Sequence, residues 1–242
     1  LIRIQKKAFS NSPNIIKKIK WLTELNSIEN KPSIFFANEF FDCLPIKQFI
    51  KINKKWYEKK IYYNKNEEKF FIDKEKICDF LLSEELDKHI KKNNIDDNQI
   101  IEISSSRKEY FNKICKFIKK NKGIIILIDY GYTSSVNFST LQSLSLNQKT
   151  SIFENVGEQD ITSLVNFNDF INIAKENNLH FFGPVTQKKF LKNIGIEERK
   201  NKILLKANEK QKRIIEIGYN RLISSNEMGE MFKFLVVSSY EF

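Results

Sequence analysis

Two short segments of this sequence place acidic, amide and aromatic side chains directly after apolar runs. The segment 38–45 (NEFFDCLP) follows the apolar run 34–37, and the segment 129–132 (DYGY) follows the apolar run 124–128. In open α/β sheets, ligands bind beyond the carboxyl ends of the strands. The two segments therefore predict a polar binding site at one edge of a sheet.

Asn38, Glu39 and Asp42 are the candidate catalytic groups of the first segment. A helical turn beginning there would bring the carboxylates of Glu39 and Asp42 to one side of the chain. Paired carboxylates can orient a cationic group through charge-assisted hydrogen bonds and can assist proton transfer. Alternatively, Asn38 caps a helix and the two acids stabilise its first turn. The residues alone leave both interpretations open.

Asp129, Tyr130 and Tyr132 form the polar part of the second segment. An acid and two aromatic rings at the exit of a central strand suit the wall of a substrate site, and we favour this interpretation. In the alternative, the segment only begins a loop in which Gly131 takes a positive φ.

A third segment, 157–162 (GEQDIT), places Glu158 and Asp160 in an otherwise basic chain. By itself, this segment favours a capping role for the helix that follows. The two histidines, His89 and His180, have no nucleophile or metal-ligand pattern beside them. We expect no catalytic role for either histidine.

The composition excludes several kinds of site. The 242 residues carry 41 Lys and Arg against 30 Asp and Glu, a net charge of +11, but only five of the basic residues are Arg. Because Arg is preferred for recognising phosphates and bases, nucleic-acid binding is not expected. The seven glycines are widely spaced, which excludes a P-loop or a dinucleotide fingerprint. Three scattered cysteines predict no metal site and suit a reducing compartment.

The predicted elements alternate between strand and helix, which favours an α/β fold. The aliphatic run 124–128 is too short to cross a bilayer, so no stable membrane insertion is expected. Helices are predicted over 1–10, 74–92, 105–120, 167–175, 186–194, 196–207 and 208–225. Strands are predicted over 34–37 (buried and parallel), over 48–63 as an antiparallel hairpin, and over 70–72, 100–103, 124–128, 180–182 and 232–237, with a strand or short helix leading to Trp21 and a loop-rich stretch over 133–160.

Five segments together resemble the MidA-like (DUF185) family of class I S-adenosylmethionine-dependent methyltransferases, whose mitochondrial members assist assembly of respiratory complex I. The segments are 37–49 (ANEFFDCLPIKQF), 129–132 (DYGY), 160–167 (DITSLVNF), 183–199 (GPVTQ, FL, GI and R) and 227–233 (EMGEMFK). Their order and spacing cover essentially the whole chain. The sequence departs from the family pattern in the third segment, which has Leu164 in place of His and Asn166 in place of Asp.

The resemblance implies a Rossmann-like, mostly parallel sheet with one antiparallel strand. It implies a β-hairpin insertion at 48–73 and a helical extension at 186–230 within a partial methyltransferase domain over 1–242. The family's first βαβ portion, with its glycine-rich cofactor loop, would precede Leu1. We therefore expect this chain alone to hold the cofactor poorly and to be inactive.

The implied cofactor is S-adenosylmethionine. The implied reaction is methyl transfer to a protein arginine on a subunit of respiratory NADH dehydrogenase. The residues carried over fall into three groups: catalytic Asn38, Glu39 and Asp42; substrate-binding Asp129, Tyr130, Tyr132, Glu158 and Asp160; and cofactor-binding Trp21, as a wall for the adenine, with Asn38 close to the transferred methyl.

The alternative function is a catalytically silent assembly factor that uses the same fold to hold a partner subunit. Leu164 and Asn166 are mild support for it. A basic RNA-associated methyltransferase is a weaker third hypothesis, because Arg is scarce. The abundance of Lys, Ile and Asn favours a bacterial cytoplasmic protein, and the mitochondrial matrix is expected if the source is eukaryotic. The sequence does not indicate an oligomeric state.

Overall fold

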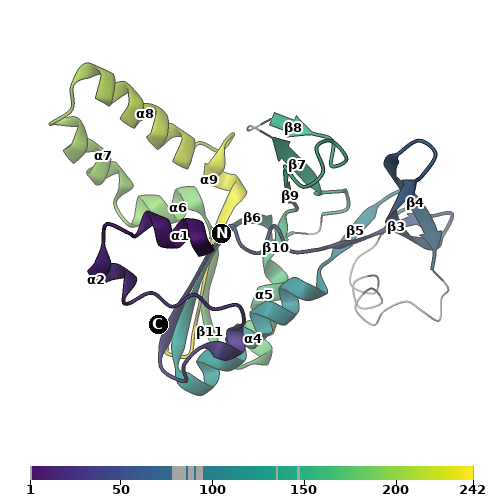
Figure 1. Ribbon diagram of the computed structural model, residues 1–242, viewed down its shortest axis with the longest axis horizontal. Helices are drawn as coiled ribbons and strands as arrows, with labels where there is room; N and C mark the ends of the chain where they lie inside the picture. The colour runs from purple at the N-terminus through teal and green to yellow at the C-terminus, as the bar shows by residue number, and fades with distance from the viewer. Residues whose placement is uncertain are drawn as a thin grey trace.

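The computed structural model describes residues 2–77, 86, 90, 95–134, 136–145 and 148–241. These residues form an α/β molecule with three sheets (Figure 1). The helices are α1 (Ile2–Ala8), α2 (Pro13–Ile16), the 3-10 helix η1 (Leu25–Ser27), α4 (Ser105–Asn121), α5 (Phe167–Glu176), α6 (Gln187–Asn193), α7 (Ile196–Leu204), α8 (Glu209–Ile223) and α9 (Met228–Met231). The strands are β1 (Ser33–Asn38), β2 (Lys47–Ile52), β3 (Lys55–Asn64), β4 (Lys69–Lys76), β5 (Ile100–Ile103), β6 (Gly123–Tyr132), β7 (Gln142–Ser145), β8 (Gln148–Thr150), β9 (Asp160–Thr162), β10 (Val165–Asn166), β11 (His180–Thr186) and β12 (Phe232–Ser238).

The central sheet is mixed, with the order β1-β6-β12-β11 and the short β10 also paired with β6. β1 and β6 are parallel, so that Asn38 lies opposite Ile128 at their carboxyl ends. β12 is antiparallel to both β6 and β11. The expected mixed sheet, with one strand running against its neighbours, is confirmed.

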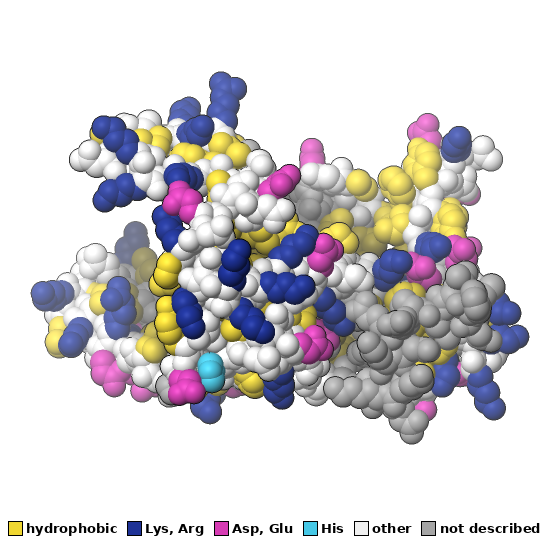
Figure 2. Space-filling model, turned by 90° about the horizontal axis from the view of Figure 1, so that it is seen from below, with side chains coloured by type: hydrophobic (Ala, Val, Ile, Leu, Met, Phe, Trp, Pro, Cys, Tyr) yellow, Lys and Arg dark blue, Asp and Glu magenta, His cyan; other side chains and the backbone are white. Residues whose placement is uncertain are grey.

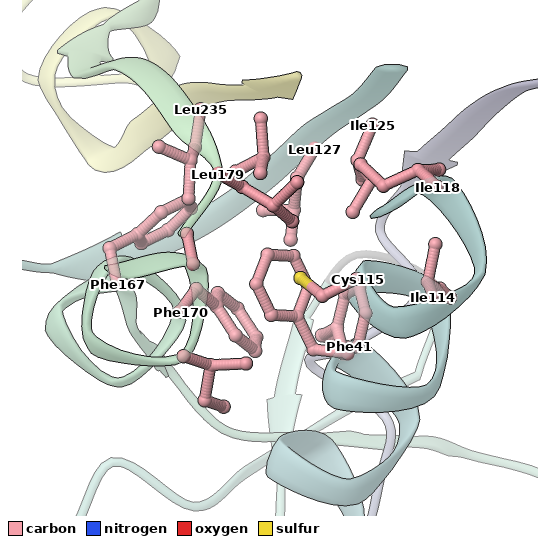
Figure 3. Close-up of a cluster of buried hydrophobic side chains, with 14 of the residues drawn as sticks. Phe41, Ile114, Cys115, Ile118, Ile125, Leu127, Phe167, Phe170, Leu179 and Leu235 are labelled. Carbon is pink, nitrogen blue, oxygen red and sulfur yellow. The ribbon is translucent and has the colours of Figure 1, made fainter. Parts of the chain in front are cut away.

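The main core lies between this sheet and the helices α4 and α5 (Figure 3). α4 buries Phe111, Ile114, Cys115 and Ile118, which recur every three or four residues and so share one helix face. Phe41, from the loop after β1, is fully buried among these side chains. Packing of Phe41 therefore ties the loop that carries the first polar segment to the core.

β1 differs from the expected fully buried strand. Ile34 and Phe36 are 71% and 65% exposed, whereas Phe35 and Ala37 pack against the core. The alternation arises because α4 covers one face of β1, and no described element covers the other. The apolar run predicted the strand and its parallel pairing correctly, but not its burial.

The second sheet has the order β4-β3-β2-β5. The expected hairpin and third strand are present, and the tight turn is made by Asn53 and Lys54, both at positive φ, as such hairpins require. The helix expected over 74–92 is wrong at 74–76, which belong to β4. Leu86 and Ile90 are helical, and the remainder of that range beyond Ile77, including His89, lies outside the described residues.

The remaining elements form a small sheet, β8-β7-β9, within the stretch expected to be loop-rich, and a helical arm. Helices α6, α7 and α8 confirm the three expected C-terminal helices. Of the strand or short helix expected before Trp21, the described residues contain the short helix, α2. Within the described ranges, no helix is long and apolar enough to span a bilayer. In Figure 1 the arm α7–α8 and the hairpin β3–β4 project at opposite ends of the molecule.

Candidate active site

The chain changes direction sharply where β1 ends. Asn38 and Glu39 are both exposed, and the Asn38 amide donates to Glu39 Oε1 at 3.3 Å. Glu39 has φ +46°, a conformation that residues other than glycine rarely adopt, while its backbone N–H donates to Ile128 O at 3.0 Å. Strained conformations of this kind concentrate at functional sites.

No helix begins at this point in the structure. The hypothesis that Asn38 is a helix cap is therefore wrong, and the expected helical turn carrying Glu39 and Asp42 is absent. The two carboxylates have different surroundings instead, because Glu39 is exposed to solvent and Asp42 is only 4% exposed.

Asp42 and Tyr130 come together although they are distant in the sequence. Tyr130 donates its hydroxyl hydrogen bond to Asp42 Oδ2. Burial is the main reason, and the hydrogen bond to Asp42 the second, why the pKa of Tyr130 is raised above its ordinary value. The phenol is therefore a protonated donor at neutral pH, and it fixes the position of the Asp42 carboxylate.

Asp129, at the end of β6, is fully buried and holds the loop after β1. Its Oδ2 accepts from the backbone N–H groups of Phe41 at 3.1 Å and Asp42 at 3.2 Å, and its Oδ1 accepts from Tyr130 N at 3.0 Å. Burial, assisted by the neighbouring Asp42, raises the pKa of Asp129 to about 7. Both oxygens of this carboxylate accept hydrogen bonds from backbone N–H groups. Asp129 therefore positions the loop after β1 and is not itself open to a ligand.

Arg107 was not among the residues expected at the site. Its guanidinium donates to the carbonyls of Phe41 (2.6 Å), Asp42 (2.8 Å) and Leu164 (2.9 Å), and to both the carbonyl (3.0 Å) and the hydroxyl (2.7 Å) of Ser163. Arg107 is 6% exposed, and burial lowers its pKa. A single arginine in the first turn of α4, in a chain with few arginines, was the available sequence signal.

Tyr132 lies apart from Tyr130, beside a small hollow that Arg107 and Glu102 also line. Burial raises its pKa above the ordinary value. Gly131, between the two tyrosines, does not take the positive φ considered for it, because β6 continues through it. The residue must be small for another reason: a Cβ here would lie 2.1 Å from Val165 O.

The acidic segment 157–162 lies in the small third sheet. Glu158 and Asp160 are exposed, and Asp160 begins β9. The helix-capping interpretation of this segment is wrong, because Asn166 caps α5 by accepting from Asn168 N.

Trp21 packs against α1. Its indole Nε1 donates to Gln5 at 2.8 Å, and the Lys6 ammonium lies 5.3 Å from the ring centroid. The predicted contact between Trp21 and an adenine ring stays a prediction.

The two departures from the family pattern have structural roles here. Leu164 donates its backbone N–H to Thr140 Oγ1 at 2.9 Å and accepts from Arg107 through its carbonyl. Asn166 forms the cap of α5. Neither side chain needs to be charged for these contacts.

Comparison with known proteins assigns the chain to a protein family. A family model described as "Putative S-adenosyl-L-methionine-dependent methyltransferase" matches residues 1–185. The chain belongs to this family. The resemblance in the sequence is thereby confirmed, and the family's cofactor is S-adenosylmethionine.

Relatives whose names describe them as methyltransferases are similar to this chain over most of its length. A Xenopus laevis protein named protein arginine methyltransferase NDUFAF7, mitochondrial, is 31% identical over 240 residues, which are 94% of this chain and 52% of the relative. A Caenorhabditis elegans homologue named in the same way is 30% identical over 89% of this chain and 49% of its own. The chain therefore spans about half the length of these relatives.

Two solved structures from Burkholderia thailandensis share the fold. An uncharacterised protein gives a TM-score of 0.81 at 20% identity, covering 100% of this chain and 64% of its own. A second, bound to S-adenosyl-homocysteine, gives a TM-score of 0.80 at 20% identity, with 100% and 62% covered. At this identity the likeness supports the α/β architecture with its mixed sheet.

The exposed end of β1 fits one side of a cofactor site. The Asn38 amide and the Glu39 carboxylate are open to solvent beyond the carboxyl ends of two parallel strands. No described residue forms an ion pair with Glu39. The Asn38 amide can donate to and accept from polar groups of such a cofactor, while the Glu39 carboxylate beside it is open to a cationic acceptor. The predicted contacts of Asn38 and Trp21 with the cofactor stay predictions.

Proposed function

We propose that the protein containing this chain transfers a methyl group from S-adenosylmethionine to an arginine side chain of another protein. The observation that carries the proposal is that Glu39, Asp42 and Tyr130 lie near the carboxyl ends of the neighbouring parallel strands β1 and β6, with Tyr130 hydrogen-bonded to Asp42, in a chain of this methyltransferase family. The names of the relatives in Xenopus and Caenorhabditis support arginine as the acceptor.

Methyl transfer to arginine requires side chains that position the guanidinium and accept its proton. When bound, S-adenosylmethionine would supply a methyl carbon on a sulfonium, so that an arginine nitrogen bonds to that carbon as the C–S bond breaks and the electron pair stays on sulfur. The proton that leaves the nitrogen would pass to the Glu39 carboxylate and from there to solvent. In-line displacement depends chiefly on positioning. Glu39 orients the guanidinium and draws positive charge toward one side of it, while Asn38 lies beside the methyl group.

Asp42 provides the second carboxylate of the arginine site. Its Oδ2 is held by Tyr130 and its backbone by Asp129 and Arg107, so its position is fixed before substrate arrives. A fixed acceptor loses less entropy when it binds a cation than a mobile one does. Tyr132, Glu158 and Asp160 complete the proposed substrate side, and Trp21 the proposed adenine wall.

The substrate protein is proposed to be a subunit of respiratory NADH dehydrogenase, methylated during assembly in the bacterial cytoplasm or the mitochondrial matrix. The word mitochondrial in the names of the relatives supports the second of these two settings. The first measurement is calorimetric titration of S-adenosylmethionine into this chain and into the protein expressed from the whole gene. Binding by the whole-gene product supports the proposal, whereas binding by neither protein favours a catalytically silent assembly factor.

The decisive variant is Glu39→Gln. We expect kcat/KM for methylation of an arginine peptide to fall by about 10²–10⁴-fold, because the charge that orients and deprotonates the guanidinium is lost. The affinity for S-adenosylmethionine should change by less than about twofold. Mass spectrometry of the peptide and calorimetry check the two quantities.

The matched control is Glu176→Gln, at an exposed glutamate at the end of α5. Activity and cofactor affinity of this control should equal those of the parent protein. An equal loss of activity and cofactor affinity in Glu39→Gln would instead assign Glu39 to cofactor binding.

A further inference from the structure

An apolar cavity of about 340 Å³ opens beside Asp42. Its walls come from four separate parts of the chain: the loop after β1, the hairpin β3–β4, Leu141 just before β7, and the segment 152–163. This volume lies within the range of pockets that bind small ligands and is large enough for a bulky apolar side chain. Asp42 lines the cavity but Asn38 and Glu39 do not, so the cavity adjoins the proposed methyl-transfer site at Asp42 and extends away from it.

The cavity is surrounded by apolar side chains that solvent reaches. Ile61, Phe70, Val156 and Ile161 are 59%, 41%, 59% and 42% exposed. The ring of Phe70 stacks on Phe153 with centroids 6.3 Å apart, so the hairpin and the loop between β8 and β9 close the cavity together. Hydrophobic side chains are visible over the hairpin end of the molecule in Figure 2. Exposed apolar surface gathered around a hollow indicates a binding surface.

One part of the cavity lining is polar. Asp42 lines it and is 4% exposed. Its Oδ2 accepts from Tyr130, but no hydrogen bond reaches its Oδ1 from any described residue. A buried carboxylate oxygen without a donor is costly, and a cationic donor from a bound molecule would satisfy it.

One side of the cavity mouth is acidic. The stretch 151–162 contains Glu154, Glu158 and Asp160 and no Lys or Arg, in a chain whose net charge is +11. All three acids are exposed, and within the described ranges none of them forms an ion pair. The local charge is thus opposite to that of the protein as a whole, which favours a cationic partner at this place.

We propose that this cavity receives a large aliphatic side chain lying within a few residues of the target arginine, in an extended and cationic segment of the substrate protein. The inference rests on the proposed function, because the arginine is held at Asp42 while its neighbour in the sequence enters the cavity. An extended chain advances about 3.3 Å per residue, so a residue two positions away reaches past Asp42. The acidic side of the mouth attracts the charge of the segment.

The test uses fluorescein-labelled heptapeptides with one central arginine and either leucine or serine two residues away, on each side in turn. Binding to the whole-gene protein is measured by fluorescence anisotropy, and methylation by mass spectrometry. We expect one of the leucine peptides to bind at least about tenfold more tightly than its serine counterpart, because an apolar side chain leaves water.

Two variants at the cavity rim and one control variant distinguish binding in the cavity from non-specific hydrophobic binding. Val156→Ser and Ile161→Ser should reduce the leucine preference to less than about twofold. Both residues are largely exposed, so folding should be retained. Leu205→Ser, at a residue of the helical arm that is 86% exposed, should leave the preference unchanged.

The outcomes for the cavity and for methylation differ. If the protein prefers the leucine peptide and the rim variants remove that preference, the cavity assignment is supported. This holds even if no peptide is methylated, and in that case only the proposal of arginine methylation fails. Equal binding of leucine and serine peptides, or no binding of any peptide up to about 1 mM, overturns the cavity assignment. Methylation of both peptides at equal rates together with equal binding would overturn the cavity while leaving the proposed function intact.

Discussion

Asp42 and Asp129 lie beside each other in the folded protein but have different tasks. Asp129 accepts three backbone hydrogen bonds and is fully buried, so it positions the loop after β1. Asp42 accepts one hydrogen bond from Tyr130 and lines a cavity. Both acids were expected at the site from the sequence, but only the number and direction of their contacts distinguish positioning from binding.

Asp129 makes stability depend on pH. Its pKa is about 7 in the folded chain, above the value of about 4 expected when unfolded, so the folded state holds the proton more tightly. Its contribution to stability is therefore complete below about pH 4 and is lost as the pH rises to about 7. Urea unfolding of the parent and of Asp129→Asn between pH 4 and pH 8 measures this dependence.

In Asp129→Asn this pH dependence should disappear. The free energy of unfolding should also fall by about 1–3 kcal/mol, because the amide replaces one accepting oxygen and leaves a buried N–H unpaired. Glu24→Gln, at an exposed acid, is the control and should show the parent's profile. A variant that keeps the parent's pH slope would show that another group titrates there.

At the scale of elements, Arg107 joins α4 to two other segments. The guanidinium connects the loop 41–42 with 163–164 through carbonyl groups that no other described side chain is seen to satisfy. In Arg107→Lys the compact ammonium cannot span these acceptors. We expect a loss of about 3 kcal/mol in unfolding free energy, measured by urea denaturation.

Arg213→Lys, at an exposed position of α8, is the matched control for Arg107 and should be neutral. If Arg107→Lys were equally neutral, the loop would be held by Asp129 and by packing of Phe41 alone.

Gly131 is required where β6 and β10 approach each other. A Cβ at this position would lie 2.1 Å from Val165 O and 2.9 Å from the Phe167 ring. Gly131→Ala should therefore lower the free energy of unfolding by about 1–3 kcal/mol, through overpacking. Thermal and urea unfolding check this value.

Gly218→Ala tests the same change where there is space. No atom lies within 4 Å of a Cβ built at Gly218, in the middle of α8. This variant should be stabilised by about 0.5–1 kcal/mol, because alanine is the better helix former. Equal effects at the two glycines would contradict the steric explanation.

At the scale of the whole molecule, the helical arm and the main core differ in how much of their surface is buried. α4 has five buried residues, whereas α7 and α8 have none. Few buried contacts permit local opening without global unfolding. In native-state hydrogen exchange, the amides of α7 and α8 should be protected about 100-fold less than those of α4 and β6. Equal protection would show that another surface covers the arm in solution.

The sequence alone determined most of the helices and strands and the positions of the polar segments. Local signals were sufficient for the helices that follow Ser104 and Asn166, for the hairpin over 48–63 and for the strand β6. These features depend on residues near one another in the chain, so periodicity and turn chemistry reveal them. Order and spacing of the segments were also sufficient to indicate the family.

Only the tertiary structure decided which of those residues meet and what each one does. Asp42 and Tyr130 are hydrogen-bonded although 88 positions separate them in the sequence, and Arg107 and Ser163 are hydrogen-bonded across 56 positions. Burial of β1 on one face, and the replacement of a predicted helix by β4 at 74–76, depend on which surfaces cover those residues. Such contacts follow from packing between distant segments, and no local pattern encodes them.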